Sequence, residues 1–300
     1  MARTRFRSDG GLTLRMGAVG LGLGALYVAF GVVLISYSNM AVGLIVTLGM
    51  AWGQWFFSDT LAMKSIGAQA VAPEQAPQLH AMIDRLCALA DMPKPRVAVA
   101  VTDMPNAFAT GRSPKHSTVC VTTGIMQRLD ADELEGVLAH ELAHVANRDV
   151  SIMTVASSLG LLAGFITRWG MFFGGGGNRD SKNNGNSVPF IVVLLVSMVV
   201  YFVSFLLTRA LSRYRELSAD RTGAYLTGKP SKLSSALVKI SGDMARIPNR
   251  DLREAQSMNA FFIAPALNRE SAGALFSTHP PLQQRLDQLA RVGAELSEQV

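Results

Sequence analysis

The pentapeptide His140-Glu141-Leu142-Ala143-His144 has residue types and a spacing that could bind and use a metal ion. On a helix, residues four apart lie one turn apart on the same face, so both imidazoles could reach one ion. The glutamate between them could approach a water on that ion and take its proton. This pattern is typical of metal-assisted hydrolysis, although five residues also match by chance and their context must support them.

A third protein ligand is expected, because a catalytic zinc usually has three and keeps one position open. Residues 147 and 150 are Asn and Val, which excludes the continuation H-E-x-x-H-x-x-G-x-x-H. Glu216 and Asp220 are four apart on a predicted helix and share a face. Glu216 could bind the metal while Asp220 holds a ligand histidine through its other ring nitrogen. Alternatively, these residues form solvated pairs with neighbouring arginines.

Several short elements are expected around the pentapeptide. Asp130 and Glu133 have the spacing of a capping box at the start of its helix. Alternating valines predict strands at 97–101 and 119–121, with a short strand and turn between them at 106–112. Further helices are expected at 73–91, 213–225, 231–244 and 282–296. Residues 256–275 are expected to be irregular.

Charge-free runs predict four membrane spans in two hairpins. Apolar residues make up 49% of the chain and charged residues 17%. Runs at 16–36, 40–57 and 188–208 approach the ~20 residues that cross a bilayer. The run that begins at 150 is weaker because Arg168 interrupts it, and a buried core helix is the alternative there. A cleaved signal peptide is the rival interpretation of the first run, but no clear cleavage site follows it.

Charge distribution predicts the topology and a division of the chain. The net charge of +6 is assigned to a membrane rather than nucleic acid, because no basic run is interleaved with aromatics. Arginines near the N-terminus favour a cytoplasmic start. The predicted units are an arm and first hairpin (1–58), the first part of a catalytic domain (59–149), a second hairpin (150–208) and the second part of the domain (209–300). Both polar parts then lie in the cytoplasm.

Four separated motifs resemble those of the gluzincin membrane peptidases, the family that includes the HtpX-type zinc endopeptidases and the CAAX prenyl proteases. They are Asn106-Ala107-Phe108-Ala109, the H-E-x-x-H pentapeptide, Glu216-x-x-x-Asp220 and Thr278-His279-Pro280-Pro281. The arrangement of two spans before and two after the pentapeptide is most similar to the HtpX type. The likeness covers nearly the whole chain. The sequence differs from the family pattern at 174–187, where the expected loop is longer and richer in Gly and Asn than the pattern needs.

The resemblance implies a mainly α membrane protein with four transmembrane helices and a cytoplasmic α+β zincin-like domain containing a small sheet. It implies one Zn²⁺ per chain, with His140, His144 and Glu216 as ligands. Glu141 is then the general base, which takes a proton from water and returns one to the leaving amine. Cys87 and Cys120 are in no C-x-x-C pattern and are expected to be buried thiols in a reducing compartment.

The roles of other polar residues stay open. His279 and Arg213 are candidate donors to the oxyanion, but His279 could also close the free metal position at rest or cap the last helix. Asn147, one turn past His144, either supports the ligands or ends the helix. His80 and His116 are given no role.

The segment Asn106, Ala107, Phe108 and Ala109 resembles the family's edge strand, to which an extended substrate could add through main-chain hydrogen bonds. An ordinary protected edge strand is the alternative. The implied function is cleavage of misfolded or damaged membrane proteins, a quality-control and stress-response role in the cell inner membrane. The alternatives are a processing peptidase for one substrate and a membrane scaffold with an inert metal motif. Substrate preference, regulation and oligomeric state are left open.

Overall fold

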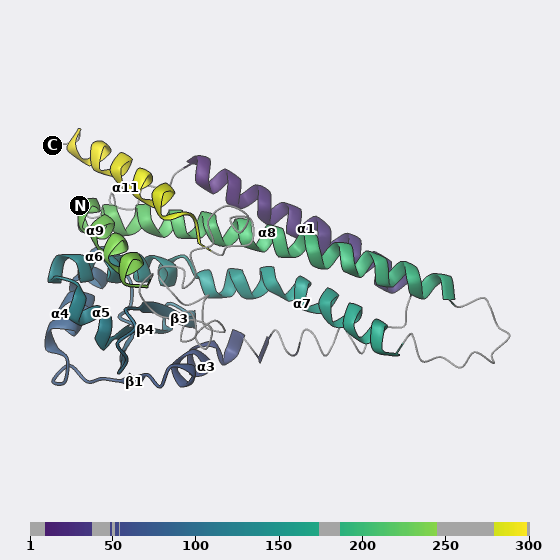
Figure 1. The fold of residues 1–300 in the computed structure, drawn as a ribbon, viewed down its shortest axis with the longest axis horizontal. Coiled ribbons are helices and arrows are strands. Elements are labelled where there is room, and N and C mark those ends of the chain that lie inside the picture. The colour runs from purple at the N-terminus through teal and green to yellow at the C-terminus, as the bar shows by residue number, and fades with distance from the viewer. Residues whose placement is uncertain are drawn as a thin grey trace.

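The computed structural model describes residues 10–37, 49, 52–53, 55–173, 187–244 and 279–298. Three long helices extend from one side of a smaller domain (Figure 1). They are α1 (Gly10–Tyr37), α7 (Asp149–Phe173) and α8 (Ser187–Thr227), and α8 packs against both of the others. The domain contains a sheet and the helices α3 (Ser58–Ser65), α4 (Pro77–Ala90), α5 (Thr123–Arg128), α6 (Ala131–Ala146), α9 (Pro230–Met244) and α11 (Leu282–Ser297).

The sheet is small and mixed, with four strands in the order β1-β2-β4-β3. The central strands β2 (Arg96–Ala100) and β4 (His116–Thr122) are parallel, and their alternating valines confirm the two predicted strands. The edge strands β1 (Gln69–Ala70) and β3 (Ala107–Ser113) pair antiparallel with them. β3 is the predicted short strand, and it lies beside α6 and α7. The outer edge of the sheet is therefore next to the helix that carries the pentapeptide.

The helix α6 lies at the centre of the domain core. Leu138 on α6 packs in a fully buried cluster with Ile83 of α4 and Val121 of β4. The predicted capping box is confirmed, because Asp130 Oδ1 accepts from the Glu133 amide at 2.8 Å and Glu133 Oε2 accepts from the Asp130 amide at 2.9 Å. Helices α8 and α9 pack on α6 as well, so elements that precede and follow α6 in the chain surround it.

Two helices in the described part of the chain are long and apolar enough to cross a membrane, Gly11–Val32 in α1 and Ile191–Thr227 in α8. A shorter apolar helix, Asp149–Gly164, lies beside α8. Apolar side chains such as Leu21 of α1 and Val199 of α8 are more than half exposed, as lipid contact requires. The predicted span at 40–57 falls mostly outside the described residues, so the count of four stays a prediction.

The structure joins the predicted span at 188–208 and the predicted helix at 213–225 into one helix, α8. No glycine or proline lies between residues 190 and 222, so nothing in the backbone ends the helix at the predicted boundary. The helices at 73–91, 231–244 and 282–296 are confirmed as α4, α9 and α11 with small shifts of their ends. Residues 256–275 lie outside the described part.

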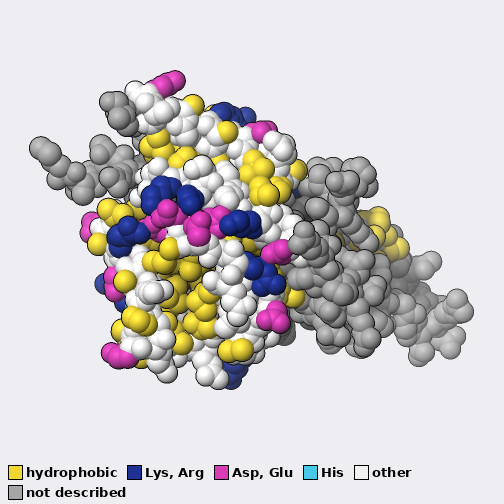
Figure 2. Space-filling model, turned by 60° about the vertical axis from the view of Figure 1, so that its left-hand side comes forward, with side chains coloured by type: hydrophobic (Ala, Val, Ile, Leu, Met, Phe, Trp, Pro, Cys, Tyr) yellow, Lys and Arg dark blue, Asp and Glu magenta, His cyan; other side chains and the backbone are white. Residues whose placement is uncertain are grey.

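Figure 2 turns the domain toward the viewer, away from the long helices. Acidic and basic side chains gather side by side near the middle of this face, among apolar ones. Ion pairs also join the start of α6 to the start of α9. Lys229 Nζ is 2.7 Å from Asp132 Oδ1, and Lys232 Nζ is 3.0 Å from Asp130 Oδ2. No histidine of the described residues comes to the surface on the face shown.

Candidate metal centre

Three side chains from two crossing helices meet at one point. The Nε2 atoms of His140 and His144, on α6, are 3.2 Å apart. Glu216 of α8 places Oε2 3.7 Å from the first and Oε1 3.4 Å from the second. All three ligand atoms lie within 4.8 Å of one another. The residues predicted as a split ligand set are therefore brought together by the fold.

The two helices approach closely because of a glycine on α8. A Cβ on Gly223 would lie 2.9 Å from the His140 amide nitrogen and 3.1 Å from its Cα. Backbone atoms in contact prefer roughly 3.5 Å or more, so only glycine fits here. Two turns before this crossing, α8 carries Glu216, which the close approach brings within reach of both imidazoles.

A buried ion pair holds the ring of His140. Its Nδ1 is 2.9 Å from Asp220 Oδ1. Arg285 of α11 binds both oxygens of this carboxylate, with Nε 2.7 Å from Oδ2 and Nη2 2.6 Å from Oδ1. Asp220 is 0% exposed and Arg285 2%. A carboxylate beside Nδ1 favours a proton on that nitrogen, which leaves the Nε2 lone pair for a metal.

A second buried ion pair lies beside the ring of His144, with a single contact from its arginine. Its Nδ1 lies 2.5 Å from Asp149 Oδ2. Arg215 Nε is 3.0 Å from the same oxygen. Asn147, the other predicted supporting residue, is exposed at the C-cap of α6. Because Arg148 adopts a left-handed φ of 57°, the chain turns and the contact to His144 is made by Asp149 at the start of α7.

This donor set fits a metal ion. Two imidazole nitrogens and one carboxylate are the ligands of many catalytic zinc sites, and here both Nε2 atoms face each other with their Nδ1 partners in place. Burial lowers the pKa of His144, but Asp149 and Glu216 outweigh burial and raise this pKa to about 10. Burial is similarly outweighed at His140, whose pKa is raised by Asp220 and Glu216. The cluster therefore holds protons where a cation would replace them.

Glu141 lies beside the edge of the sheet. It is buried, and its Oε2 accepts a hydrogen bond from the Ala109 amide at 2.9 Å. Burial is the main cause that raises the pKa of Glu141, and the charge of Glu216 adds to it, while both histidines oppose them. A carboxylate with a raised pKa is a stronger base. A cation at the cluster would lower this pKa again.

The predicted substrate segment has one residue with a described contact to Glu141, which is Ala109. Its N–H points away from β4 and toward α6, which marks the outer edge of β3. Ala107 and Phe108 are buried, Phe108 in a cluster with residues of α3, β2 and β4. The Asn106 amide donates to Thr122 Oγ1 at 2.9 Å, so Asn106 anchors the start of β3 to β4.

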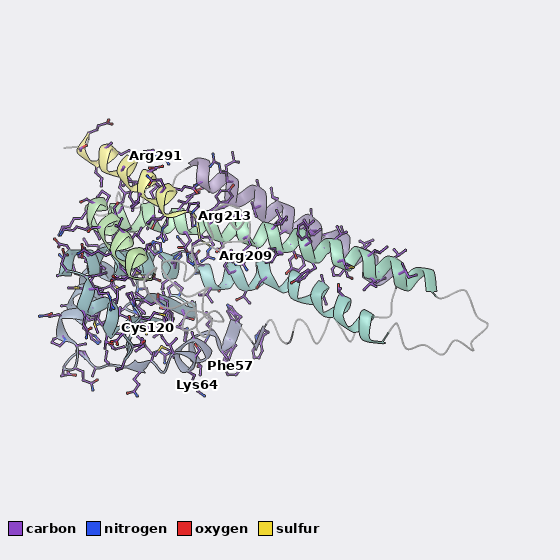
Figure 3. The ribbon with its side chains drawn as sticks, in the orientation of Figure 1. Phe57, Lys64, Cys120, Arg209, Arg213 and Arg291 are labelled. Atoms are coloured by element: carbon purple, nitrogen blue, oxygen red, sulfur yellow. The ribbon has the colours of Figure 1, made fainter. Side chains whose placement is uncertain are left out.

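Of the two predicted oxyanion donors, His279 lies at the cluster. It is buried just before α11, and its Nδ1 is 3.1 Å from Glu216 Oε2. Arg213 lies on α8 near the junction of the long helices and the domain (Figure 3). Arg285 also lies beside the ligands, with Nη1 3.9 Å from Glu216 Oε2.

Sequence reasoning missed Asp149, Arg215 and Arg285. A usable signal was present in the last helix, where buried residues 285, 288, 289 and 292 follow a helical stripe. An arginine on such a stripe needs a buried partner. No comparable pattern marks Asp149 or Arg215.

Elsewhere, His80 Nε2 is 3.0 Å from the Val71 carbonyl, and burial raises the pKa of the Cys87 and Cys120 thiols to about 11 and about 12.

Comparisons with known proteins place this geometry in context. Residues 73–292 match the family described as Peptidase family M48. A protease HtpX homolog of Moorella thermoacetica is 53% identical over 99% of both chains. Protease HtpX homolog 1 of Streptomyces coelicolor is 52% identical over 99% of this chain and 97% of its own. The crystal structure of Ste24p from S. mikatae is similar in fold, with a TM-score of 0.51 at 16% identity, covering 94% of this chain and 66% of that chain.

Proposed function

The chain belongs to peptidase family M48, and we propose that this membrane metalloprotease is a zinc endopeptidase that cleaves misfolded or damaged membrane proteins. One Zn²⁺ would be held by His140, His144 and Glu216. The observation that carries the proposal is the meeting of these three ligands beside buried Glu141 at the edge of a sheet. The proposed metal ligands, base and substrate-binding edge would thus be adjacent.

When bound, zinc supplies a Lewis acid that polarises a carbonyl and acidifies water. Glu141 takes the proton from the attacking water and later passes a proton to the leaving amine. Asp220 and Asp149 keep protons on the Nδ1 atoms of the two histidines, so that both Nε2 atoms stay available. We assign the oxyanion donor to His279, whose Nδ1 contacts Glu216, and Arg213 stays the alternative.

The substrate would bind as an extended strand along β3. Edge strands pair with added strands through main-chain groups, which reads little of the side-chain sequence. The Ala109 N–H faces this edge and is engaged by Glu141. Such binding suits segments that have lost their fold, which supports quality control over the processing of one defined substrate.

The site would lie in the cytoplasm, close to the surface of the cell inner membrane. We propose four spans in two hairpins, with residues 59–149 and 209–300 forming one domain. Phe57, Lys64, Arg209 and Arg213 are all at the junction of the long helices and the domain (Figure 3), and aromatic and basic residues are typical of a membrane interface. A site at this junction favours substrates that come from the membrane.

Glu141→Gln tests the proposal in purified, zinc-loaded protein. This variant should stop cutting casein and unfolded membrane proteins while it still binds one zinc. Glu135→Gln is the matched control, because Glu135 is a buried glutamate of the same helix that pairs with Arg85 instead. A wild-type chain that binds no zinc and cuts nothing would favour an inert scaffold, and cleavage of a single substrate would favour the processing enzyme.

A further inference from the structure

The helices α7 and α8 pack closely through small residues of α7. A Cβ on Gly160 would lie 3.1 Å from Ser204 Oγ, and one on Gly164 would lie 3.2 Å from the Tyr201 ring. Thr208 Oγ1 donates to the Ala156 carbonyl at 3.2 Å, which joins the helices further along. Small residues let helix backbones approach in this way inside membranes. Larger side chains at these positions would push α7 and α8 apart.

Where this contact meets the domain, a buried ion pair joins the same two helices. Asp149 is the first residue of α7, and Arg215 is on α8 directly before the ligand Glu216. Arg215 Nε is 3.0 Å from Asp149 Oδ2, and both residues are buried. Removing one partner of such a pair leaves an uncompensated buried charge, so the two side chains are expected to act as a unit.

The shared oxygen of this pair also contacts the metal ligand. Asp149 Oδ2 is 2.5 Å from His144 Nδ1 and is the atom that Arg215 approaches. Arg215 thus fixes the position and charge of the group that orients His144. Partners of this kind commonly change metal affinity by about 10–100-fold when they are removed.

We propose that Arg215 is a positioning residue of the metal centre, acting through Asp149 to keep Nε2 of His144 directed at the metal. The inference rests on the proposed function, because it takes His144 as a ligand. Since each member of the pair comes from a different long helix, the packing of α7 against α8 sets whether the pair can form. The packing of α7 against α8 therefore affects metal binding through the orientation of the His144 ring.

The test measures metal binding by the full chain in detergent, in the Glu141→Gln background so that cleavage does not interfere. Arg215→Met keeps the length of the side chain and removes its charge. It should weaken Zn²⁺ binding about 10–100-fold in competition with a chromophoric chelator. It should also change the visible absorption of the Co²⁺-loaded protein, because one ligand is misoriented. Arg215→Lys restores the charge without the planar group, so its Zn²⁺ affinity should lie between those of the parent protein and Arg215→Met.

Arg221→Met is the matched control on the same helix. Arg221 is also largely buried and pairs with Glu295 of α11 at 2.8 Å, so its loss should lower thermal stability and leave Zn²⁺ affinity and the Co²⁺ spectrum unchanged. In the Asp149→Asn background, Arg215→Met should have little further effect on Zn²⁺ affinity if Arg215 acts through Asp149. Fully additive losses would overturn the inference.

Gly160→Leu separates α7 from α8 without touching the pair. It should weaken Zn²⁺ binding in the same direction as Arg215→Met. The proposal is overturned if Arg215→Met and Arg215→Lys both fold and bind Zn²⁺ and Co²⁺ like the parent protein. Failure of the parent itself to bind zinc would instead refute the proposed function.

Discussion

Replacing Gly223 with alanine should separate the two halves of the metal centre. The new Cβ would lie 2.9 Å from the His140 amide nitrogen, and contact atoms prefer roughly 3.5 Å, so α8 must move by about 0.6 Å. Metal sites tolerate only about 0.2 Å in ligand distances. Glu216, two turns away on α8, would therefore leave its position relative to both imidazoles. Overpacking at such a crossing also costs about 1–3 kcal/mol.

The assay compares unfolding of the metal-free chain with its Zn²⁺ affinity. We expect Gly223→Ala to lower stability by up to about 2 kcal/mol, since an overpacking cost of about 1–3 kcal/mol is offset by the ~1 kcal/mol that alanine gains over glycine in a helix. Zn²⁺ affinity should fall by about tenfold or more. Gly242→Ala on α9 is the control, because a Cβ there meets nothing within 4 Å, and it should raise stability. A Gly223→Ala protein that is as stable as the parent and binds zinc equally well would refute this reasoning.

Three further predictions concern protons, the capping network and the edge strand. Because the pKa of metal-free His144 is about 10 and that of His140 is also raised, Zn²⁺ must displace protons below pH 10, so calorimetry in different buffers should show proton release and an affinity that falls as pH falls. Burial would raise the pKa of Glu133, but Lys239, Ser235 and the Asp130 amide outweigh burial and lower it, so the charged carboxylate stabilises the fold at pH values above its unfolded pKa near ~4.3. Glu133→Gln should therefore lower the urea midpoint at pH 7. The difference between this variant and the parent protein should shrink as pH falls through the folded pKa of Glu133. Ala109→Pro removes the N–H that donates to Glu141 and spares the pairing of β3 with β4. Because this hydrogen bond lowers the pKa of Glu141, its loss should shift the acid limb of the pH–cleavage profile to higher pH, and substrate binding should weaken. An unchanged pH–cleavage profile would argue against the hydrogen bond.

Local signals predicted the elements that carry the site. The capping box at Asp130, the helical pentapeptide and the alternating valines each depend on neighbours within a few residues, and each appears in the structure. Spacing on α8 also identified Glu216 and Asp220 as candidates. Spacing alone does not decide whether they serve a metal site or form solvent-exposed ion pairs with neighbouring arginines. The crossing at Gly223 and the contacts of Glu216 and Asp220 with the histidines show that this face of α8 is turned toward α6.

The partners of the histidines could not be predicted, because they come from distant segments. Arg285 binds Asp220, 65 residues earlier in the chain, and Arg215 contacts Asp149 at the start of α7. Nothing local distinguishes Arg215 from Arg213, two residues earlier on the same helix. The change from apolar to charged residues after Thr208 predicts a helix boundary, but α8 continues through it.

The most direct test of the account is the zinc content of three purified chains, measured by atomic absorption beside cleavage of casein. The parent protein should contain one zinc and cut casein. Glu141→Gln should contain one zinc and cut nothing, and Glu216→Ala should contain none and cut nothing. Full zinc content in Glu216→Ala would contradict the ligand set that joins α6 to α8.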